Sequence, residues 1–177
     1  MAAVIREKAP DAELYAVKIF DDTLATSIER LDRGIRWAAD AGAHLINLSL
    51  GTARAEHGAI LVDAVQYASA RGSLIVAADE SDGVRWLPGS LEGVLGVGLD
   101  WTCPRDTYWT RVTAIGPRFL TSGYARPIPN VPLEANLKGI SFAVAAMSGI
   151  VARLLEAHPA LTRDAIATRL AGRSANA

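Results

Sequence analysis

The hydrophobic positions of this chain fall into short apolar runs separated by longer amphipathic stretches. The short runs are rich in β-forming residues and predict strands at 12–20, 44–50, 73–78, 93–98 and 111–115. Apolar residues at helical spacing predict α-helices at 26–41, 59–70, 141–157 and 161–170. The stretch 117–138 is rich in proline and is predicted to be irregular.

This alternation of strands and helices predicts an α/β fold with a mainly parallel sheet flanked by helices. The run 73–78 is almost entirely apolar, as expected for a strand that helices cover on both faces. No repeat or linker divides the sequence, so a single domain spanning 1–177 is predicted. In such sheets functional groups gather at the carboxyl ends of strands, which here are 49–51, 79–83 and 113–116.

The amino-acid composition limits the partners and cofactors that the chain is expected to have. Half of the residues are apolar and the formal net charge is −1, which gives no reason to expect nucleic acid or a membrane as a partner. The single cysteine, Cys103, excludes an internal disulfide and is expected to be buried. No Cys/His cluster has metal-ligand spacing, so no metal or other cofactor is expected. Residues 1–10 show no signal peptide, so the chain as written is expected to be soluble and cytoplasmic.

Four ordered segments carry a resemblance to a known family. They are GIRWAADAGAHLINLSLG at 34–51, AVQYASARGSLIVAA at 64–78, LEGVLGVGLD at 91–100, and LKGISFAVAAMSGIVARLLEAHPALT at 137–162. In this order they resemble the subtilisin-like serine peptidases, and APDAELYAVKIF upstream is similar to another strand of that family. The resemblance covers residues 1 to about 172 and implies the later part of the subtilisin fold.

The resemblance places Ser141 at the position of the catalytic nucleophile. Gly139 permits a close approach of backbone to substrate, and Ser141 opens an apolar helix whose positive end suits a developing oxyanion. A plain helix cap is the alternative for Ser141. Ser49, Leu50 and Gly51 match the segment whose backbone pairs with an extended peptide, or they form an ordinary strand end.

Two catalytic segments of the family are absent from the sequence. The aspartate-bearing strand end and the H-G-T-H segment would both precede Met1, and residues 1–10 resemble the end of the histidine-bearing helix. Ser141 therefore lacks its usual general base within the chain. His57 is the one histidine predicted on the side of the site and is the candidate substitute base. His44 is expected to be structural, His158 lies too far along the helix, and unperturbed carboxylates are poor bases.

The oxyanion position also departs from the family pattern. The family's A-A-G-N-E-G aligns so that Ser81 replaces the asparagine that donates to the oxyanion. Losing one such donor costs roughly 3–4 kcal/mol of transition-state stabilisation. Asp79 and Glu80 add negative charge, and the loop 79–82 lacks the ligand spacing of a calcium site. Two interpretations of this acidic loop stay open: loss of the family's catalytic pattern, or a new binding feature. Ala145 and Ala146 stand where the family usually has Pro-His.

The resemblance implies a gap in the sheet, because the family's aspartate-bearing strand lies between the strands equivalent to 12–20 and 44–50. One of three outcomes is expected: the two edges close on each other, 12–20 shifts away, or self-association or a second chain supplies pairing. Three functions follow. The chain is a weak or unconventional serine hydrolase acting on peptides or esters, one part of a split enzyme, or a non-catalytic pseudopeptidase that binds extended peptides.

Overall fold

A computed structural model describes residues 1–176 of the chain. The helices are α1 Ala2–Lys8, α2 Ile28–Asp40, α3 Gly58–Ala70, α4 Ile140–Ala157 and α5 Arg163–Ala171, with 3₁₀ turns η1 Ala55–His57 and η2 Leu133–Ala135. The strands are β1 Leu45–Leu48, β2 Leu74–Ala78, β3 Glu80–Ser81, β4 Val84–Arg85, β5 Val94–Leu99, β6 Trp109–Thr113 and β7 Gly116–Thr121. The main sheet has the order β1-β2-β5-β7-β6, in which only β6 is antiparallel to its neighbour. The predicted α/β fold with a mainly parallel sheet is confirmed.

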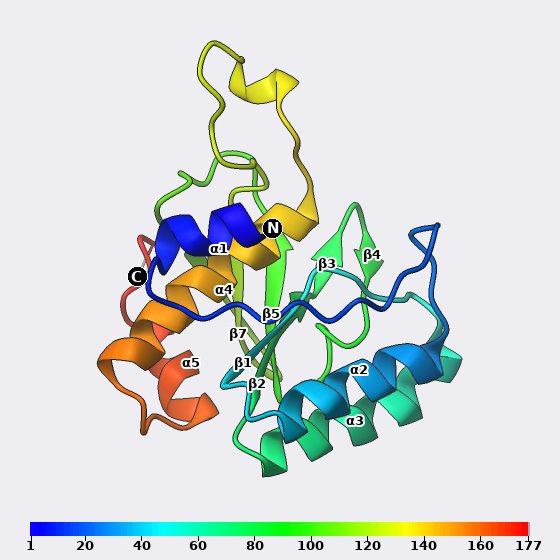
Figure 1. The fold of residues 1–177 in the computed structure, drawn as a ribbon. Helices are drawn as coiled ribbons and strands as arrows, with labels where there is room; N and C mark the ends of the chain where they lie inside the picture. Colours follow the sequence, from blue (N-terminus) through cyan, green and yellow to red (C-terminus); the bar gives the residue numbers. More distant parts are fainter. Residues whose placement is uncertain (177) are drawn as a thin grey trace.

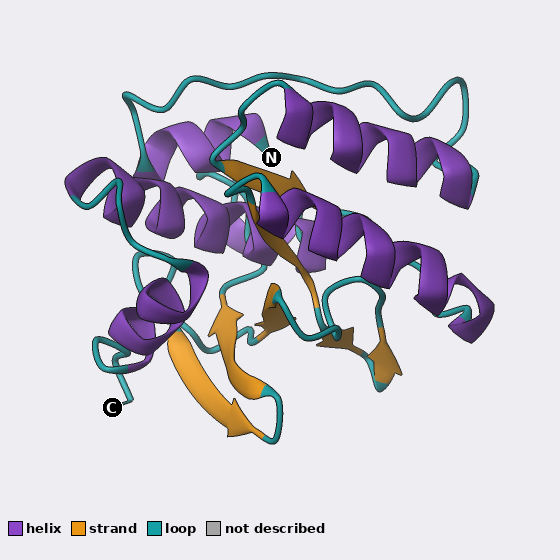
Figure 2. Cartoon of the chain, turned by 90° about the horizontal axis from the view of Figure 1, so that it is seen from below, coloured by secondary structure: helices purple, strands orange, loops and turns teal. Residues whose placement is uncertain are grey.

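Helices cover both faces of the sheet (Figures 1 and 2). On one face α2 and α3 pack on alternate side chains of β1 and β2, among them Ile46, Leu48 and Ile75. On the other face α4 and α5 cover Val76, Val97 and neighbouring apolar residues. This division follows from the alternation of side chains along each strand. It also places the start of α4 near the carboxyl ends of the strands, where the sequence predicts a site.

Side-chain caps fix where two of the helices begin. The Ser27 hydroxyl accepts a hydrogen bond from the backbone of Arg30 at the start of α2. Thr162 accepts in the same way from the backbone of Ala165 and is the N-cap of α5. Cys103 is buried, also as predicted.

The prediction of a strand at 12–20 is wrong. This segment is extended but belongs to no strand, and Tyr15 is 74% exposed. It runs along the outside of the molecule from α1 to α2, beyond β1 (Figures 1 and 2). Its far end is held at the start of α2, because the Ile19 carbonyl accepts from Thr26 Oγ1, just before the helix, at 2.8 Å and from Arg30 within it at 3.4 Å. A run of β-forming residues needs a partner strand, and this segment has none among the described residues.

The prediction of irregular structure throughout 117–138 is wrong at its start. Strand β7 occupies Gly116–Thr121, pairs with β5 on one side and forms a hairpin with β6 on the other. Pro117 and Arg118 interrupt the apolar run by which a strand is recognised in the sequence. Phe119 and Thr121 are nevertheless fully buried. The rest of the stretch projects as a long loop containing η2 (Figure 1).

Helix α4 is long and apolar enough to cross a membrane by length and composition alone. Half of that window is buried inside the protein, and core helices pass the same test. Its buried side chains, including Val144, Met147 and Val151, pack in the core cluster over the sheet. The structure therefore accounts for the apolar character of α4 by its place in the core.

Candidate active site

Ser141 lies in the first turn of α4, directly after the backbone has made a sharp change of direction. Gly139 precedes the helix with φ of 143°, a conformation that side-chain-bearing residues rarely adopt. The Gly139 carbonyl accepts a hydrogen bond from the Phe142 amide, which closes the first turn. The site serine is therefore presented at the positive end of an 18-residue helix.

The structure brings Ser141 together with Ser49, which follows the carboxyl end of β1. The Ser141 hydroxyl donates to the Ser49 carbonyl at 3.2 Å. In return the Ser49 hydroxyl donates to the Ser141 carbonyl, also at 3.2 Å. Two predicted site residues 92 positions apart are thus joined by reciprocal hydrogen bonds. In this arrangement the Ser141 proton is held by a carbonyl and not by a base.

The rest of the predicted peptide-binding segment, Leu50 and Gly51, is held by contacts with the loop at Leu87 and with the core. Thr52, one residue beyond Gly51, exchanges two backbone hydrogen bonds with Leu87, at 3.0 and 2.9 Å. A Cβ at Gly51 would lie 2.8 Å from the Leu87 carbonyl oxygen, so this close approach requires a glycine. Leu50 packs at the edge of the core cluster under α2 and α3. The segment 49–51 is therefore anchored at both its ends.

The predicted oxyanion residue, Ser81, lies in a small hairpin that follows β2. Strands β3 and β4 pair across Asp82 and Gly83, which both have positive φ, of 53° and 75°. Such a turn is typical of an Asp-Gly hairpin. The Ser81 hydroxyl accepts a hydrogen bond from the Trp86 indole at 3.3 Å. Its own proton is left available for donation.

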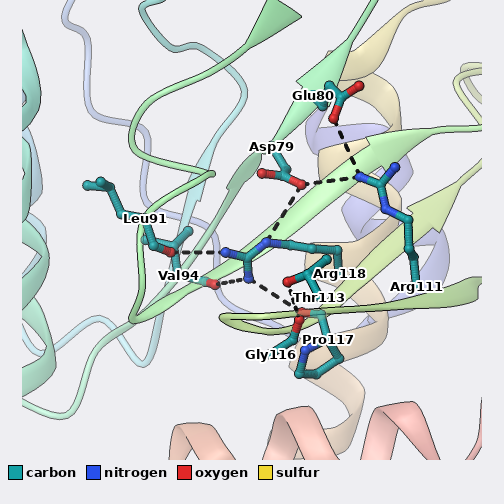
Figure 3. A network of polar contacts seen from close by, with 9 residues as sticks. All are labelled: Asp79, Glu80, Leu91, Val94, Arg111, Thr113, Gly116, Pro117 and Arg118. Atoms are coloured by element: carbon teal, nitrogen blue, oxygen red, sulfur yellow. Dashed lines mark hydrogen bonds and ion pairs between the residues drawn. The ribbon is translucent and has the colours of Figure 1, made fainter. Parts of the chain in front are cut away.

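A charged cluster lies at the root of this hairpin (Figure 3). Arg118 and Asp79 are only 3% and 5% exposed, and Arg118 Nε lies 3.6 Å from Asp79 Oδ2. Arg111 reaches the carboxylates of Asp79 and Glu80, each at 3.6 Å. The guanidinium group of Arg118 also donates to the carbonyls of three residues, at 3.3 to 3.4 Å: Leu91, Val94 and Pro117.

A glycine makes room for the buried arginine. The Arg118 side chain crosses the face of β5, where a Cβ at Gly96 would lie 2.7 Å from Arg118 Cδ. Burial raises the pKa of the Asp79 carboxyl above its usual value, and the charges of Arg118 and Arg111 partly offset this rise. Burial likewise lowers the pKa of Arg118, against the opposing effect of Asp79. The cluster thus combines two incompletely solvated charges with ion pairs longer than ordinary hydrogen bonds.

The histidines make their described contacts with groups other than the Ser141 hydroxyl. His57 Nδ1 is 3.3 Å from Thr52 Oγ1, while the Ser141 hydroxyl is bonded to the Ser49 carbonyl. His44 contributes its carbonyl to the start of the β1–β2 ladder. His158 caps the opposite end of α4, beside a cavity of about 300 Å³ that Tyr108 and Arg173 also line. No described histidine shares a hydrogen bond with Ser141, and His57 as a base stays a prediction.

The model of the subtilase family matches residues 2–175 of the chain. The chain belongs to the subtilase family. It is 30% identical over 173 residues to a thermostable alkaline protease of Halalkalibacterium halodurans, covering 92% of this chain and 45% of that protein. It is 43% identical over 75 residues to subtilisin Savinase of Lederbergia lenta, covering 42% of this chain and 27% of that protein. The chain spans less than half the length of these relatives.

Solved subtilase-like structures agree with this fold. Sphericase superposes with a TM-score of 0.69 at 22% identity, covering 93% of this chain and 61% of that one. The prenylagaramide maturation protease PagA superposes with a TM-score of 0.61 at 30% identity, covering 80% of this chain and 54% of that one. The partial coverage of the longer proteins agrees with the expectation that this subtilase chain corresponds to the later part of the fold.

Sequence reasoning missed several residues around this subtilase site. The Asn47 amide donates to Ser49 Oγ at 2.9 Å, and the Ser148 hydroxyl donates to Asn47 Oδ1 at 2.9 Å. No pattern in the sequence indicates either residue. Arg118 and Arg111 resemble surface residues in the sequence. The Asp-Gly pair at 82–83 was the one available signal, since it is typical of a hairpin.

Proposed function

We propose that this chain is the serine-bearing part of a subtilase peptidase, that Ser141 is its nucleophile, and that it acts on extended peptides. The observation that carries the proposal is the placement of Ser141 at the start of α4 against the end of β1, with reciprocal hydrogen bonds to Ser49. This geometry supports the proposal, because a hydroxyl, a helix N-terminus and the strand end that we propose pairs with peptide lie at one place.

The chain's own residues supply part of what acyl transfer needs. The helix dipole of α4 and the backbone N–H of Ser141 favour a developing negative charge. Ser81 has a free hydroxyl proton and is the proposed oxyanion donor, although its hairpin also carries Glu80 and Asp82. What the sequence lacks is an imidazole placed to take the Ser141 proton, so ordinary triad chemistry requires a histidine and an aspartate from elsewhere.

The free edge of β1 supports completion by an added strand. The described residues pair with β1 only through β2, and the His44 carbonyl accepts from Leu74 across that ladder. Backbone groups of successive residues in a strand point alternately to either side, so those of Leu45 and Asn47 point away from β2. The extended segment 12–20 passes this side without pairing. We propose that a parallel strand from another polypeptide segment inserts here and brings the missing groups.

Hydrogen exchange tests this strand addition. In the chain alone, the amides of Leu45 and Asn47 should exchange rapidly, because no acceptor protects them. When the strand is supplied by fusing to Met1 the aspartate- and histidine-bearing part of the thermostable alkaline protease, both amides should become protected while those of β2 hardly change. Unchanged, fast exchange at both positions in a folded fusion would contradict strand addition.

A serine-reactive fluorophosphonate tests the nucleophile. Ser141→Ala should abolish labelling at this position, because no other residue can replace the lost hydroxyl. Wild-type labelling of the isolated chain that His57→Ala removes would identify His57 as an unconventional base. Labelling only in the fusion would favour the split arrangement. Labelling that persists in Ser141→Ala, or a folded fusion that is never labelled, would overturn the proposal.

A pseudopeptidase is the second candidate, and one observation favours it. The Ser141 hydroxyl is held by the Ser49 carbonyl, so in the described state it contacts no base. A peptide N–H could pair with the same carbonyl at the strand end. A chain that binds an extended peptide equally well with Ser141→Ala, and is never labelled, would fit this function.

A further inference from the structure

A directional chain of hydrogen bonds leads from the middle of α4 to Ser141. Ser148 is 1% exposed, and its hydroxyl donates to Asn47 Oδ1 at 2.9 Å. The Asn47 amide then donates to Ser49 Oγ at 2.9 Å. The Ser49 hydroxyl donates in turn to the Ser141 carbonyl. In each of the three bonds the residue farther from Ser141 along this chain of bonds is the donor, so all three bonds run toward Ser141.

We propose that Asn47 and Ser148 are positioning residues for Ser141. This inference rests on the proposed role of Ser141 as nucleophile, but the chain of bonds can be tested without any activity. Neither residue touches substrate in the proposal. They act through Ser49, whose hydroxyl and carbonyl hold the first turn of α4 and the Ser141 side chain.

The position of Asn47 explains why it needs Ser148. On β1, Ile46 and Leu48 face the layer of α2 and α3, so Asn47 faces the α4 layer, as side chains alternate along a strand. A polar amide between a sheet and an apolar helix is costly unless both its ends are hydrogen-bonded. Ser148 satisfies the oxygen end and Ser49 the nitrogen end.

The orientation of the Asn47 amide sets the direction of the bonds that follow it. Its oxygen faces Ser148 on α4 and its nitrogen faces Ser49. The opposite orientation would place an acceptor beside Ser49, and the Ser49 hydroxyl would then donate to Asn47 instead of to the Ser141 carbonyl. Loss of the Ser148 hydroxyl removes one of the two hydrogen bonds that hold the Asn47 amide, and so frees the amide to turn and draw Ser49 away from the Ser141 carbonyl.

The chain of bonds also includes a residue of the free edge. Asn47 has its side chain in this network and its backbone groups on the unpaired side of β1. A strand added at this edge would fix the backbone of Asn47 and, through the side chain, the contact between Ser49 and Ser141. Completion of the sheet would thus order the nucleophile as well as supply the missing groups.

Nuclear magnetic resonance of the chain tests the network directly. In Ser148→Ala the side-chain amide protons of Asn47 should exchange about 10-fold faster, and the amide signals of Ser49 and Ser141 should shift. Asn47→Asp keeps the acceptor for Ser148 but removes the donor to Ser49, and should shift Ser49 and Ser141 while leaving Ser148 bonded. Ser73→Ala is the matched control, since it removes another buried serine hydroxyl, which donates to the Ala43 carbonyl at 2.6 Å.

The functional readout is the labelling of Ser141 in the fusion. Ser148→Ala should lower the maximal labelling rate by about 10- to 100-fold without changing the concentration of probe at half-maximal rate, and Ser73→Ala should change neither. A fusion that is never labelled would contradict the proposed function but not the hydrogen-bond network. The magnetic resonance experiment tests that network independently of activity. Asn47 and Ser141 signals that are identical in wild type and Ser148→Ala would overturn the inference.

Discussion

The two sides of the candidate site are built from different interactions. On the side of β1 and α4, neutral side chains are joined by hydrogen bonds of 2.9 to 3.2 Å around Ser49 and Ser141. On the side of β2 and β7, buried Asp79 and Arg118 face each other at 3.6 Å, and half-exposed Arg111 joins them (Figure 3). The first side presents Ser141, the proposed nucleophile, and the second supports the hairpin that carries Ser81.

The two sides also differ in where their residues depart from the family's pattern. The neutral side lies within segments that closely resemble the subtilase strings, and its geometry suits a serine at a helix start. The charged side contains the departures at Asp79, Glu80 and Ser81, in the segment proposed to hold the oxyanion, while α4 on the neutral side departs at Ala145 and Ala146. Short directional bonds fix the orientation of individual groups, whereas longer ion pairs mainly stabilise the loop as a unit.

The largest effect should come from the charged side. Arg118→Met leaves the Asp79 carboxylate buried without its partner and should lower the free energy of unfolding by about 3–5 kcal/mol, as measured by urea denaturation. The matched control is Arg111→Met, whose side chain is 47% exposed and which should cost at most about 1 kcal/mol.

The double variant Arg118→Met with Asp79→Leu sharpens this result. It leaves neither charge buried, so much of the lost stability should return. A single Arg118→Met variant as stable as the wild type would show that the two buried charges do not support each other.

The next effect concerns the hairpin and Ser81, its proposed oxyanion donor. Ser81→Asn places an amide that can still accept from Trp86 and can donate toward an oxyanion. In the fusion it should accelerate fluorophosphonate labelling of Ser141 by up to about 100-fold. A rate equal to that of wild type would mean that Ser81 lies outside the oxyanion position.

The smallest effect is a dependence of stability on pH. Since burial raises the pKa of Asp79, the folded state binds this proton more tightly than the unfolded chain does. The contribution of this group is fully present below its ordinary pKa of about 3.9 and is lost as pH rises through the raised value. The free energy of unfolding of wild type relative to Asp79→Asn should therefore fall as pH rises from about 3 to 7. A difference that rises with pH would mean that Arg118 and Arg111 outweigh burial.

The fold was predictable wherever local pattern and tertiary packing agree. Helical spacing located α2, α3, α4 and α5, and the apolar run at 73–78 located β2. The prediction for 12–20 failed because β-forming residues make a strand only when they pair, and this segment passes the free edge of β1 without pairing with any described residue. Strand β7 was missed because its buried arginine looks like a surface residue until Gly96 is seen beneath it.

The site was predictable only where residues belong to recognisable segments. Ser141 and Ser49 follow from a helix start and a strand end, and the structure joins them. The bond between Asn47 and Ser148 links positions 101 residues apart, and no local pattern indicates it. The ion pair of Asp79 and Arg118 is equally non-local, because it depends on β7 lying next to β5.

Peptide hydrolysis by the completed site tests the central claim most directly. The chain is fused at Met1 to the aspartate- and histidine-bearing part of the thermostable alkaline protease, and cleavage of an extended peptide is followed by mass spectrometry. The account predicts cleavage by the fusion and none by its Ser141→Ala variant, because both fusions share every other catalytic group. Equal cleavage by the two fusions, or no cleavage by a folded fusion with a protected β1 edge, would contradict it.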